Sequence, residues 1–201
     1  RILREWHVKV PPKSKFRTGP GDRPFRIERK MPDISTRFIE QKKKLFDLYF
    51  KNLNEKQREA VYQINGPLLI LAGAGSGKTT VLVNRLAYLT RYGNAYHDPV
   101  VPQNAGALLA EMAKAEAMNR EELGEYLTKF AVNPPPAWSV MAITFTNKAA
   151  REIKERIKKI FGEDSREAAE LMTGTFHSIC LQFLRRYGSQ IGYDRNFTIC
   201  D

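Results

Sequence analysis

The sequence predicts an α/β fold in which short strands alternate with helices. Apolar runs occur at residues 68–72, 140–145 and 172–175, and a stretch with apolar residues at helical spacing follows each of them. A glycine-rich segment, 72–79, joins the first run to its helix. This alternation is typical of a parallel sheet with helices on both faces. We expect such a sheet here, interrupted by a helical insertion at about 94–138.

The first fifty residues form a basic amino-terminal extension. They carry 14 Lys and Arg against 6 Asp and Glu, which is +8 of the chain's net charge of +11. Residues 9–32 are rich in Pro, Gly, Lys and Arg without any period, which predicts an extended arm. A helix is expected near 34–50, where apolar side chains recur at helical spacing: Phe38, Leu45, Phe46 and Tyr49. The charge suits a polyanion such as nucleic acid and equally suits a solvated tail, so the partner of the arm stays open.

The insertion contains signals for two helices. Residues 104–118 are rich in Ala, and Asn119 with Glu122 forms a predicted capping box that opens a helix to about Phe130. Three prolines at 134–136 end it, because proline cannot continue a helix. The insertion holds no catalytic-looking cluster of side chains, so we expect a helical surface hairpin.

The segment Ala72–Thr79 predicts a phosphate-binding loop and therefore a P-loop NTPase fold. It fits G-x-x-x-x-G-K-[ST] except for Ala72, a small residue that is easily accommodated. Glycines let backbone N–H groups turn toward phosphate oxygens, and the helix that follows adds its positive end. Lys78 is expected to bridge the β- and γ-phosphates of ATP, and the Thr79 hydroxyl to ligate Mg²⁺, as the two catalytic residues. The predicted loop contacts are Ala72, Gly73, Ala74, Gly75, Ser76, Gly77, Lys78, Thr79 and Thr80. The strand before and the helix after disfavour a chance glycine-rich turn.

Gln57 is a second nucleotide-binding candidate, on the helix before the loop. A Gln amide donates and accepts at once, which matches the N6/N7 edge of adenine. Asn54 and Gln57 also form a capping box in the sequence, and this structural role competes for the same side chain.

Polar and aromatic residues follow the second and third apolar runs. The carboxyl ends of parallel strands form one binding edge, so these residues are expected beside the phosphate loop. Hydroxyl, amide and helix-start N–H groups can hold phosphates, and rings can stack on bases. The candidate residues for such a second, larger ligand are Thr144, Phe145, Asn147, Thr175 and His177. Taken singly, Phe145 fits core packing and His177 a structural histidine equally well.

Four segments together resemble the UvrD/Rep/PcrA group of superfamily 1 DNA helicases. They are Leu53–Val61, Ala72–Thr79, Ala142–Ile153 and Gly174–Ser178, in the order of that group's Q motif, motif I, motif Ia and T-x-H motif. The resemblance implies a partial RecA-like motor domain 1A over 51–201. It implies the ATP and Mg²⁺ contacts named above, and it implies that the strand-end candidates bind single-stranded DNA. It also implies ATP-driven 3′→5′ translocation and duplex unwinding by the whole protein.

The resemblance also implies what this stretch lacks. The family keeps its acidic Mg²⁺-binding residue, its arginine finger and its second motor domain downstream of the matched motifs, so we expect binding of nucleotide without unwinding. Other classes stay open: another P-loop ATPase, or a nucleotide-binding interaction module. A nucleotide kinase is disfavoured because no Arg-rich lid follows Thr79. Two cysteines and no apolar membrane span favour the cytoplasm.

Overall fold

The structure, a computed structural model, describes residues 33–73, 75–163, 165–194 and 197–198. The chain divides into two units, residues 1–31 and residues 32–201. The predicted arm at 9–32 and the loop residue Ala74 lie outside the described residues.

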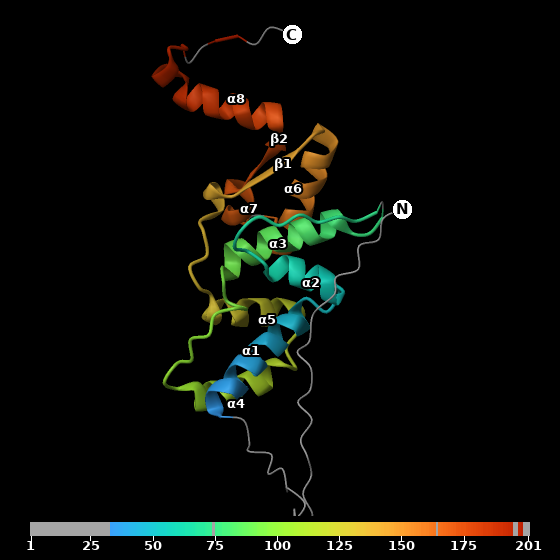
Figure 1. Ribbon diagram of the computed structural model, residues 1–201, viewed down its shortest axis with the longest axis vertical. Helices are drawn as coiled ribbons and strands as arrows, with labels where there is room; N and C mark the ends of the chain where they lie inside the picture. Colours follow the sequence, from blue (N-terminus) through green and yellow to red (C-terminus); the bar gives the residue numbers. More distant parts are fainter. Residues whose placement is uncertain (1–32, 74, 164, 195–196, 199–201) are drawn as a thin grey trace, which may run out of the picture. The chain divides into compact units, whose positions relative to one another are not determined.

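The described residues form an α/β structure that consists mostly of helices (Figure 1). The elements in order are α1 (Ile34–Tyr49), α2 (Glu55–Tyr62), α3 (Lys78–Tyr92), α4 (Ala105–Ala115), α5 (Arg120–Leu127), β1 (Met141–Thr144), α6 (Asn147–Phe161), α7 (Arg166–Glu170), β2 (Met172–Thr175) and α8 (Phe176–Tyr187). Short 3₁₀ turns occupy Thr128–Phe130, Ala137–Ser139 and Gly188–Ile191. Both predicted capping boxes are confirmed, at Asn54 with Gln57 and at Asn119 with Glu122.

The sheet contains β1 and β2, which pair in parallel with Met141 opposite Met172 and Thr144 opposite Thr175. Ala142 of β1 is buried, whereas Met141 is 45% and Ile143 47% exposed. Because side chains alternate along a strand, one face of β1 lies on the core and the other is open. The prediction of helices on both faces is therefore not met at β1 within the described residues.

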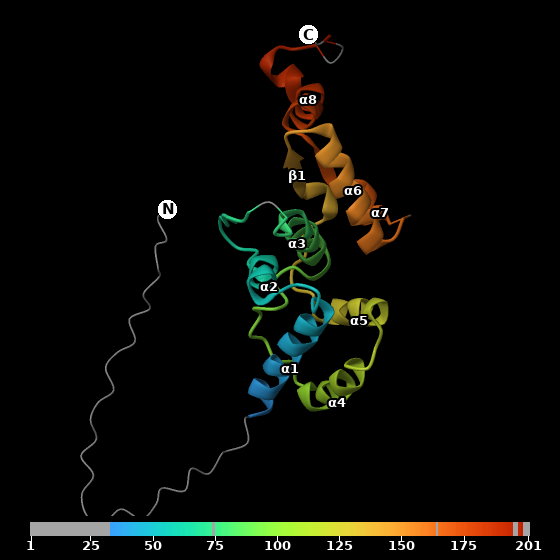
Figure 2. The same ribbon diagram turned by 90° about the vertical axis from the view of Figure 1, so that its right-hand side faces the viewer.

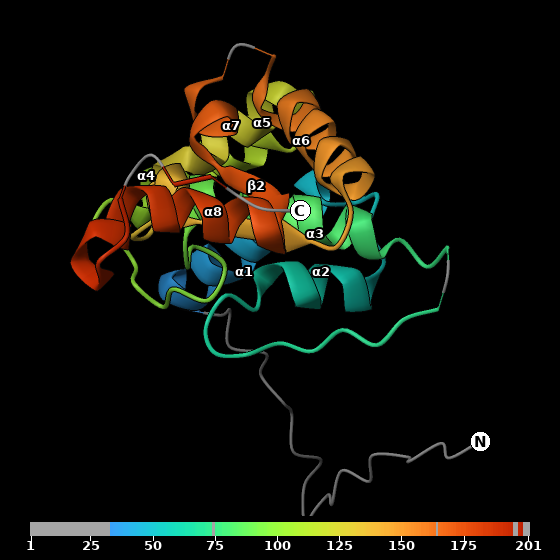
Figure 3. The ribbon, with the colours of Figure 1, turned by 90° about the horizontal axis from the view of Figure 1, so that it is seen from above.

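The predicted strand at residues 68–72 is wrong for this structure. Residues 68–72 are assigned to no strand, and Leu69 and Leu71 are 81% and 86% exposed. Figure 3 draws the segment as extended coil before α3. The physical reason is that a strand needs a neighbour to take its backbone hydrogen bonds, and β1 and β2 pair only with each other among the described strands.

An aromatic cluster forms the first core, between α1, α2, α3 and the insertion. Phe46 lies at its centre and is fully buried. Its ring meets four tyrosine rings edge-on, with centroids 5.3–6.5 Å away: Tyr62, Tyr88, Tyr92 and Tyr96. Such edge-to-face pairs add to the stabilisation that burial itself gives.

The segment predicted as an insertion contains the helices α4 and α5, and both pack on α1. Helices α1 and α4 lie side by side (Figure 2), and Met112 and Leu127 are buried in the same core as α1. Glu116, just after α4, accepts hydrogen bonds from Gln41 Nε2 at 2.6 Å and Lys44 Nζ at 2.7 Å. These contacts join segments more than seventy residues apart, which no local sequence pattern reveals.

A second core lies between α3, β1, α6 and α7. It contains Val83 and Leu86 of α3, Ala142 of β1, and Ile153 and Ile157 of α6. Helix α3 also contributes to the aromatic cluster through its opposite face. The helix that follows the glycine-rich loop is therefore packed on two sides.

Candidate nucleotide site and strand-end surface

The glycine-rich loop has the backbone that its glycines predict. Gly75 and Gly77 adopt φ values of +75° and +85°, a region that side chains disfavour. Gly77 is the N-cap of α3, and a Cβ there would meet Gln57 Nε2 at 3.0 Å. The loop thus needs glycine at 77 for both its conformation and its close approach to α2.

Lys78 turns back onto its own loop. Its exposed ammonium group donates to Ala72 O at 2.8 Å and Gly73 O at 2.6 Å. The Ser76 hydroxyl also donates to Gly73 O, at 2.7 Å. These carbonyl oxygens carry partial negative charge and accept hydrogen bonds from the lysine, as phosphate oxygens can. The side chain therefore lies at the loop, at the first residue of α3, where the positive helix end favours an anion.

Gln57 uses both ends of its amide. Its Oε1 accepts from the Asn54 N–H at 3.0 Å, which closes the capping box, and its Nε2 donates to Ser76 O at 3.1 Å. The two expected roles therefore divide between two atoms: the oxygen caps α2 and the nitrogen reaches the glycine-rich loop. An adenine would have to share or replace these partners.

Thr79 is the only hydroxyl that the sequence analysis assigns to a metal, and the local chemistry suits magnesium. Mg²⁺ prefers oxygen ligands and is commonly held by one or two protein groups together with substrate phosphates and water. Among the described residues no cluster of three or more His, Cys, Asp or Glu side chains could hold a metal alone. A single threonine hydroxyl beside a phosphate loop fits a metal that arrives with its nucleotide.

Arg85 fixes α3 against α2, a role that sequence reasoning missed because the residue lies on an apolar stripe. Its Nη1 donates to Ala60 O at 2.6 Å and also to Gln63 O. Burial lowers the pKa of Arg85. An arginine inside an apolar helical stripe was the available signal, since it must find carbonyl partners when buried.

The strand-end candidates on β1 lie at the start of α6. Phe145 is completely exposed, which excludes the core-packing alternative in this structure. Thr146 caps α6 by accepting from the Ala149 N–H at 3.2 Å, and Thr144 Oγ1 donates to Thr146 O at 3.0 Å. Asn147, the first residue of α6, is exposed. The fully exposed ring of Phe145 thus lies beside the N-terminus of α6.

The candidates on β2 lie at the neighbouring strand end, because Thr144 and Thr175 are paired in register. His177 is exposed, as a surface contact requires. Thr175 is buried and caps α8, accepting from the Ser178 N–H at 3.3 Å. The structure thus brings the two strand ends together, but Thr175 has a structural role that limits its reach. Because residues 68–72 are unpaired, the sheet does not join this surface to the glycine-rich loop.

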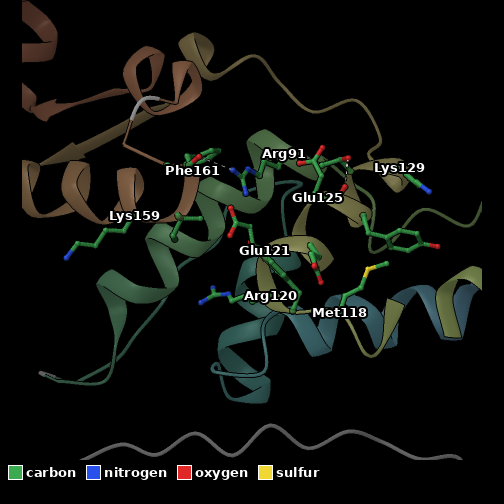
Figure 4. Close-up of a pocket in the computed structure, with 14 residues that line it drawn as sticks. Arg91, Met118, Arg120, Glu121, Glu125, Lys129, Lys159 and Phe161 are labelled. Carbon is green, nitrogen blue, oxygen red and sulfur yellow. Dashed lines mark hydrogen bonds between the residues drawn. The ribbon is translucent and has the colours of Figure 1, made fainter. Parts of the chain in front are cut away.

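A large open cavity of about 1280 Å³ lies at the other end of α3 from the loop (Figure 4). It is lined by α5 and by the ends of α3 and α6, with four cationic and three acidic side chains: Arg91, Arg120, Lys129, Lys159, Glu121, Glu122 and Glu125. Mixed charge gives it little preference for an anion, and none of the predicted site residues lines it.

In the described part of the chain, no helix combines the length and apolarity that a membrane span needs.

Comparison with known proteins gives two consistent matches. A sequence model of the UvrD/REP helicase N-terminal domain matches residues 53–101 and 123–201. The chain is 39% identical over 151 residues to an ATP-dependent DNA helicase PcrA of Staphylococcus epidermidis, and 39% identical over 150 residues to one of Staphylococcus aureus. Each alignment covers 75% of this chain, which spans 15% of the length of these relatives.

Proposed function

The chain belongs to the family of UvrD/REP helicase N-terminal domains, and from this premise we propose that it is the ATP-binding part of a DNA helicase. The longer protein moves 3′→5′ along single-stranded DNA and unwinds duplexes in the cytoplasm. The observation that carries the proposal is the glycine-rich loop with Lys78 folded into it at the start of α3.

Nucleotide binding follows from the loop. The phosphates of Mg-ATP take the place of the Ala72 and Gly73 carbonyl oxygens as partners of Lys78, and the loop N–H groups hold the remaining oxygens. Thr79 supplies a hydroxyl to the Mg²⁺ that the nucleotide brings. The loop belongs to the RecA-like P-loop fold that the family implies.

DNA binding follows from the strand-end surface. The exposed rings of Phe145 and His177 stack on bases, while Asn147 and the N–H groups at the start of α6 contact the backbone. Thr144 and Thr175 pair in register at the two strand ends, so these contacts come from neighbouring strands.

Replacing Phe145 by alanine tests this surface. Base stacking on an aromatic ring is worth about 1–3 kcal/mol per base, so a labelled single-stranded oligonucleotide should bind roughly 5- to 150-fold more weakly by fluorescence anisotropy. His177→Ala should add to the loss. Phe183→Ala, which removes a partly exposed ring from the second half of α8, is the control and should bind like wild type. Wild-type affinity in both Phe145→Ala and His177→Ala would remove the strand-end surface from the proposal.

A base-specificity measurement separates the two roles of Gln57. Gln57→Ala should weaken ATP more than GTP, by about 1–3 kcal/mol for a bidentate contact. Asn54→Ala breaks the same capping box but keeps the amide, so it should leave the ratio of ATP to GTP affinity unchanged. Equal losses for both nucleotides in Gln57→Ala would assign the residue to capping alone.

Another P-loop ATPase or a nucleotide-binding interaction module would share the nucleotide site. The fully exposed Phe145 beside a helix N-terminus favours the DNA-binding alternative, because a bare ring on a polar edge suits base stacking. Nucleotide binding together with no binding of oligonucleotide at low salt would favour the interaction module instead.

A further inference from the structure

The glycine-rich loop and the strand-end surface are joined through the contact between α3 and α6. Arg156 of α6 donates from Nη1 to Thr80 Oγ1 at 3.4 Å. Thr80 directly follows Thr79 in the loop motif, and α6 begins at Asn147 on the strand-end surface. A movement at the start of α3 can therefore reach α6 through this hydrogen bond, and α6 leads back to the surface proposed to bind DNA.

Arg156 is held on its own helix, and a second arginine contact joins α3 to α6. On α6, Glu152 accepts from Arg156 Nη2 at 2.6 Å, which fixes the guanidinium on its own helix. At the far end of the two helices, the Arg91 guanidinium lies 4.5 Å from the centroid of the Phe161 ring and donates to Phe161 O at 3.4 Å. Two arginine contacts thus connect the helices, one near the loop and one at the opposite end.

A second acceptor lies one turn further along α3. Asn84 is buried, and its Nδ2 donates to Thr80 O at 2.8 Å. Its Oδ1 is buried and has no hydrogen-bond partner among the described residues. Residues four apart share a helix face, so this oxygen lies on the same face as Thr80. A buried acceptor without a donor is unfavourable and offers a second position for an arginine.

We propose that Arg156 is a positioning residue that couples nucleotide binding to DNA binding, an inference that rests on the proposed function. When ATP draws Lys78 away from the Ala72 and Gly73 carbonyls, the start of α3 shifts with Thr80. The guanidinium then passes toward Asn84 Oδ1, and α6 carries the movement to Phe145 and Asn147. Neither end of this path requires Arg156 to touch ATP or DNA.

The test is the effect of nucleotide on DNA affinity. A labelled single-stranded oligonucleotide is titrated with the full 201-residue chain, without nucleotide and with a saturating non-hydrolysable ATP analogue and Mg²⁺. Wild type should show two dissociation constants that differ by about 5-fold or more, in either direction. In both Arg156→Gln and Thr80→Val, the two dissociation constants should differ by less than about 2-fold. Lys154→Gln removes the same charge from an exposed position on α6 and should retain the wild-type ratio.

A double variant gives the decisive comparison. Thr80→Val with Arg156→Gln should lose no more coupling than either single variant, because both remove one interaction. Additive losses, a wild-type ratio in Arg156→Gln, or a wild-type chain whose DNA affinity ignores nucleotide would each overturn the proposal. If the wild-type chain binds neither ligand, the proposed function itself fails. Should Arg156→Gln not fold, Thr80→Val decides, because valine keeps the shape of threonine and lacks the hydroxyl. Its nucleotide affinity is measured separately, since Thr80 is also a predicted loop contact, and the nucleotide analogue is kept saturating.

Discussion

Replacing Phe46 by alanine is expected to destabilise the protein by about 3–5 kcal/mol, the usual cost of truncating a buried phenylalanine. The ring is fully buried and meets Tyr62, Tyr88, Tyr92 and Tyr96 edge-on, so its loss leaves a cavity and removes favourable aromatic contacts. Urea unfolding followed by circular dichroism measures the change. This is the core that joins α1 and the insertion to α3, so nucleotide binding should weaken as well.

Phe145→Ala is the matched control, because it removes the same ring from a fully exposed position. Exposed substitutions usually change stability by less than about 0.5 kcal/mol. Phe46→Ala should therefore lower the free energy of unfolding, whereas Phe145→Ala should keep it and weaken DNA binding. An unfolding midpoint for Phe46→Ala equal to that of wild type would mean that the aromatic cluster does not support the fold.

The parts of the fold that were predictable are those whose signals are local. The capping boxes that begin α2 and α5 each lie within four residues, so the sequence alone reveals them. Helix α7 was missed, because only five residues carry it, although Ser165 caps it by accepting from the Ala168 N–H. A helix this short has too little periodicity to stand out in a sequence.

The parts that were not predictable depend on partners far along the chain. Residues 68–72 have strand composition but no strand beside them, and composition alone cannot supply backbone partners. The burial of Lys42 was unpredictable for the same reason. In the sequence it is one of three consecutive lysines, which suggests a surface position. In the structure it is buried, and its Nζ donates to Asp98 O at 2.8 Å. Burial lowers the pKa of Lys42, and the nearby Asp98 carboxylate partly opposes this effect.

The family match and the packing together explain the position of the insertion. Helix α1 and residues 102–122 lie outside the matched segments, and they pack against each other in the aromatic core. Each would expose apolar side chains without the other. These two unmatched segments therefore stabilise each other on the face of α3 that carries the aromatic cluster.

Replacing Lys78 by alanine is expected to weaken nucleotide binding by about 1.5–3 kcal/mol, roughly 10- to 150-fold, because it removes a charge-assisted contact to phosphate. A fluorescent ATP analogue, titrated with Mg²⁺ present, measures the affinity. Part of the loss has a structural source, since the ammonium group also holds Ala72 O and Gly73 O. The loop should be more mobile in the variant. Because Ala72, Gly73 and Lys78 are all exposed, the free energy of unfolding should change only slightly.

Two companions make the Lys78 result specific. Lys51→Ala removes an exposed lysine from the turn after α1 and should bind nucleotide like wild type, which controls for net charge. Lys78→Arg keeps the charge but places a planar guanidinium where a compact ammonium lies between two carbonyl oxygens, so it should recover only part of the affinity. Equal affinities for wild type and Lys78→Ala would mean that the loop does not bind phosphate. Full recovery in Lys78→Arg would mean that charge alone, rather than the geometry of the loop, holds the nucleotide.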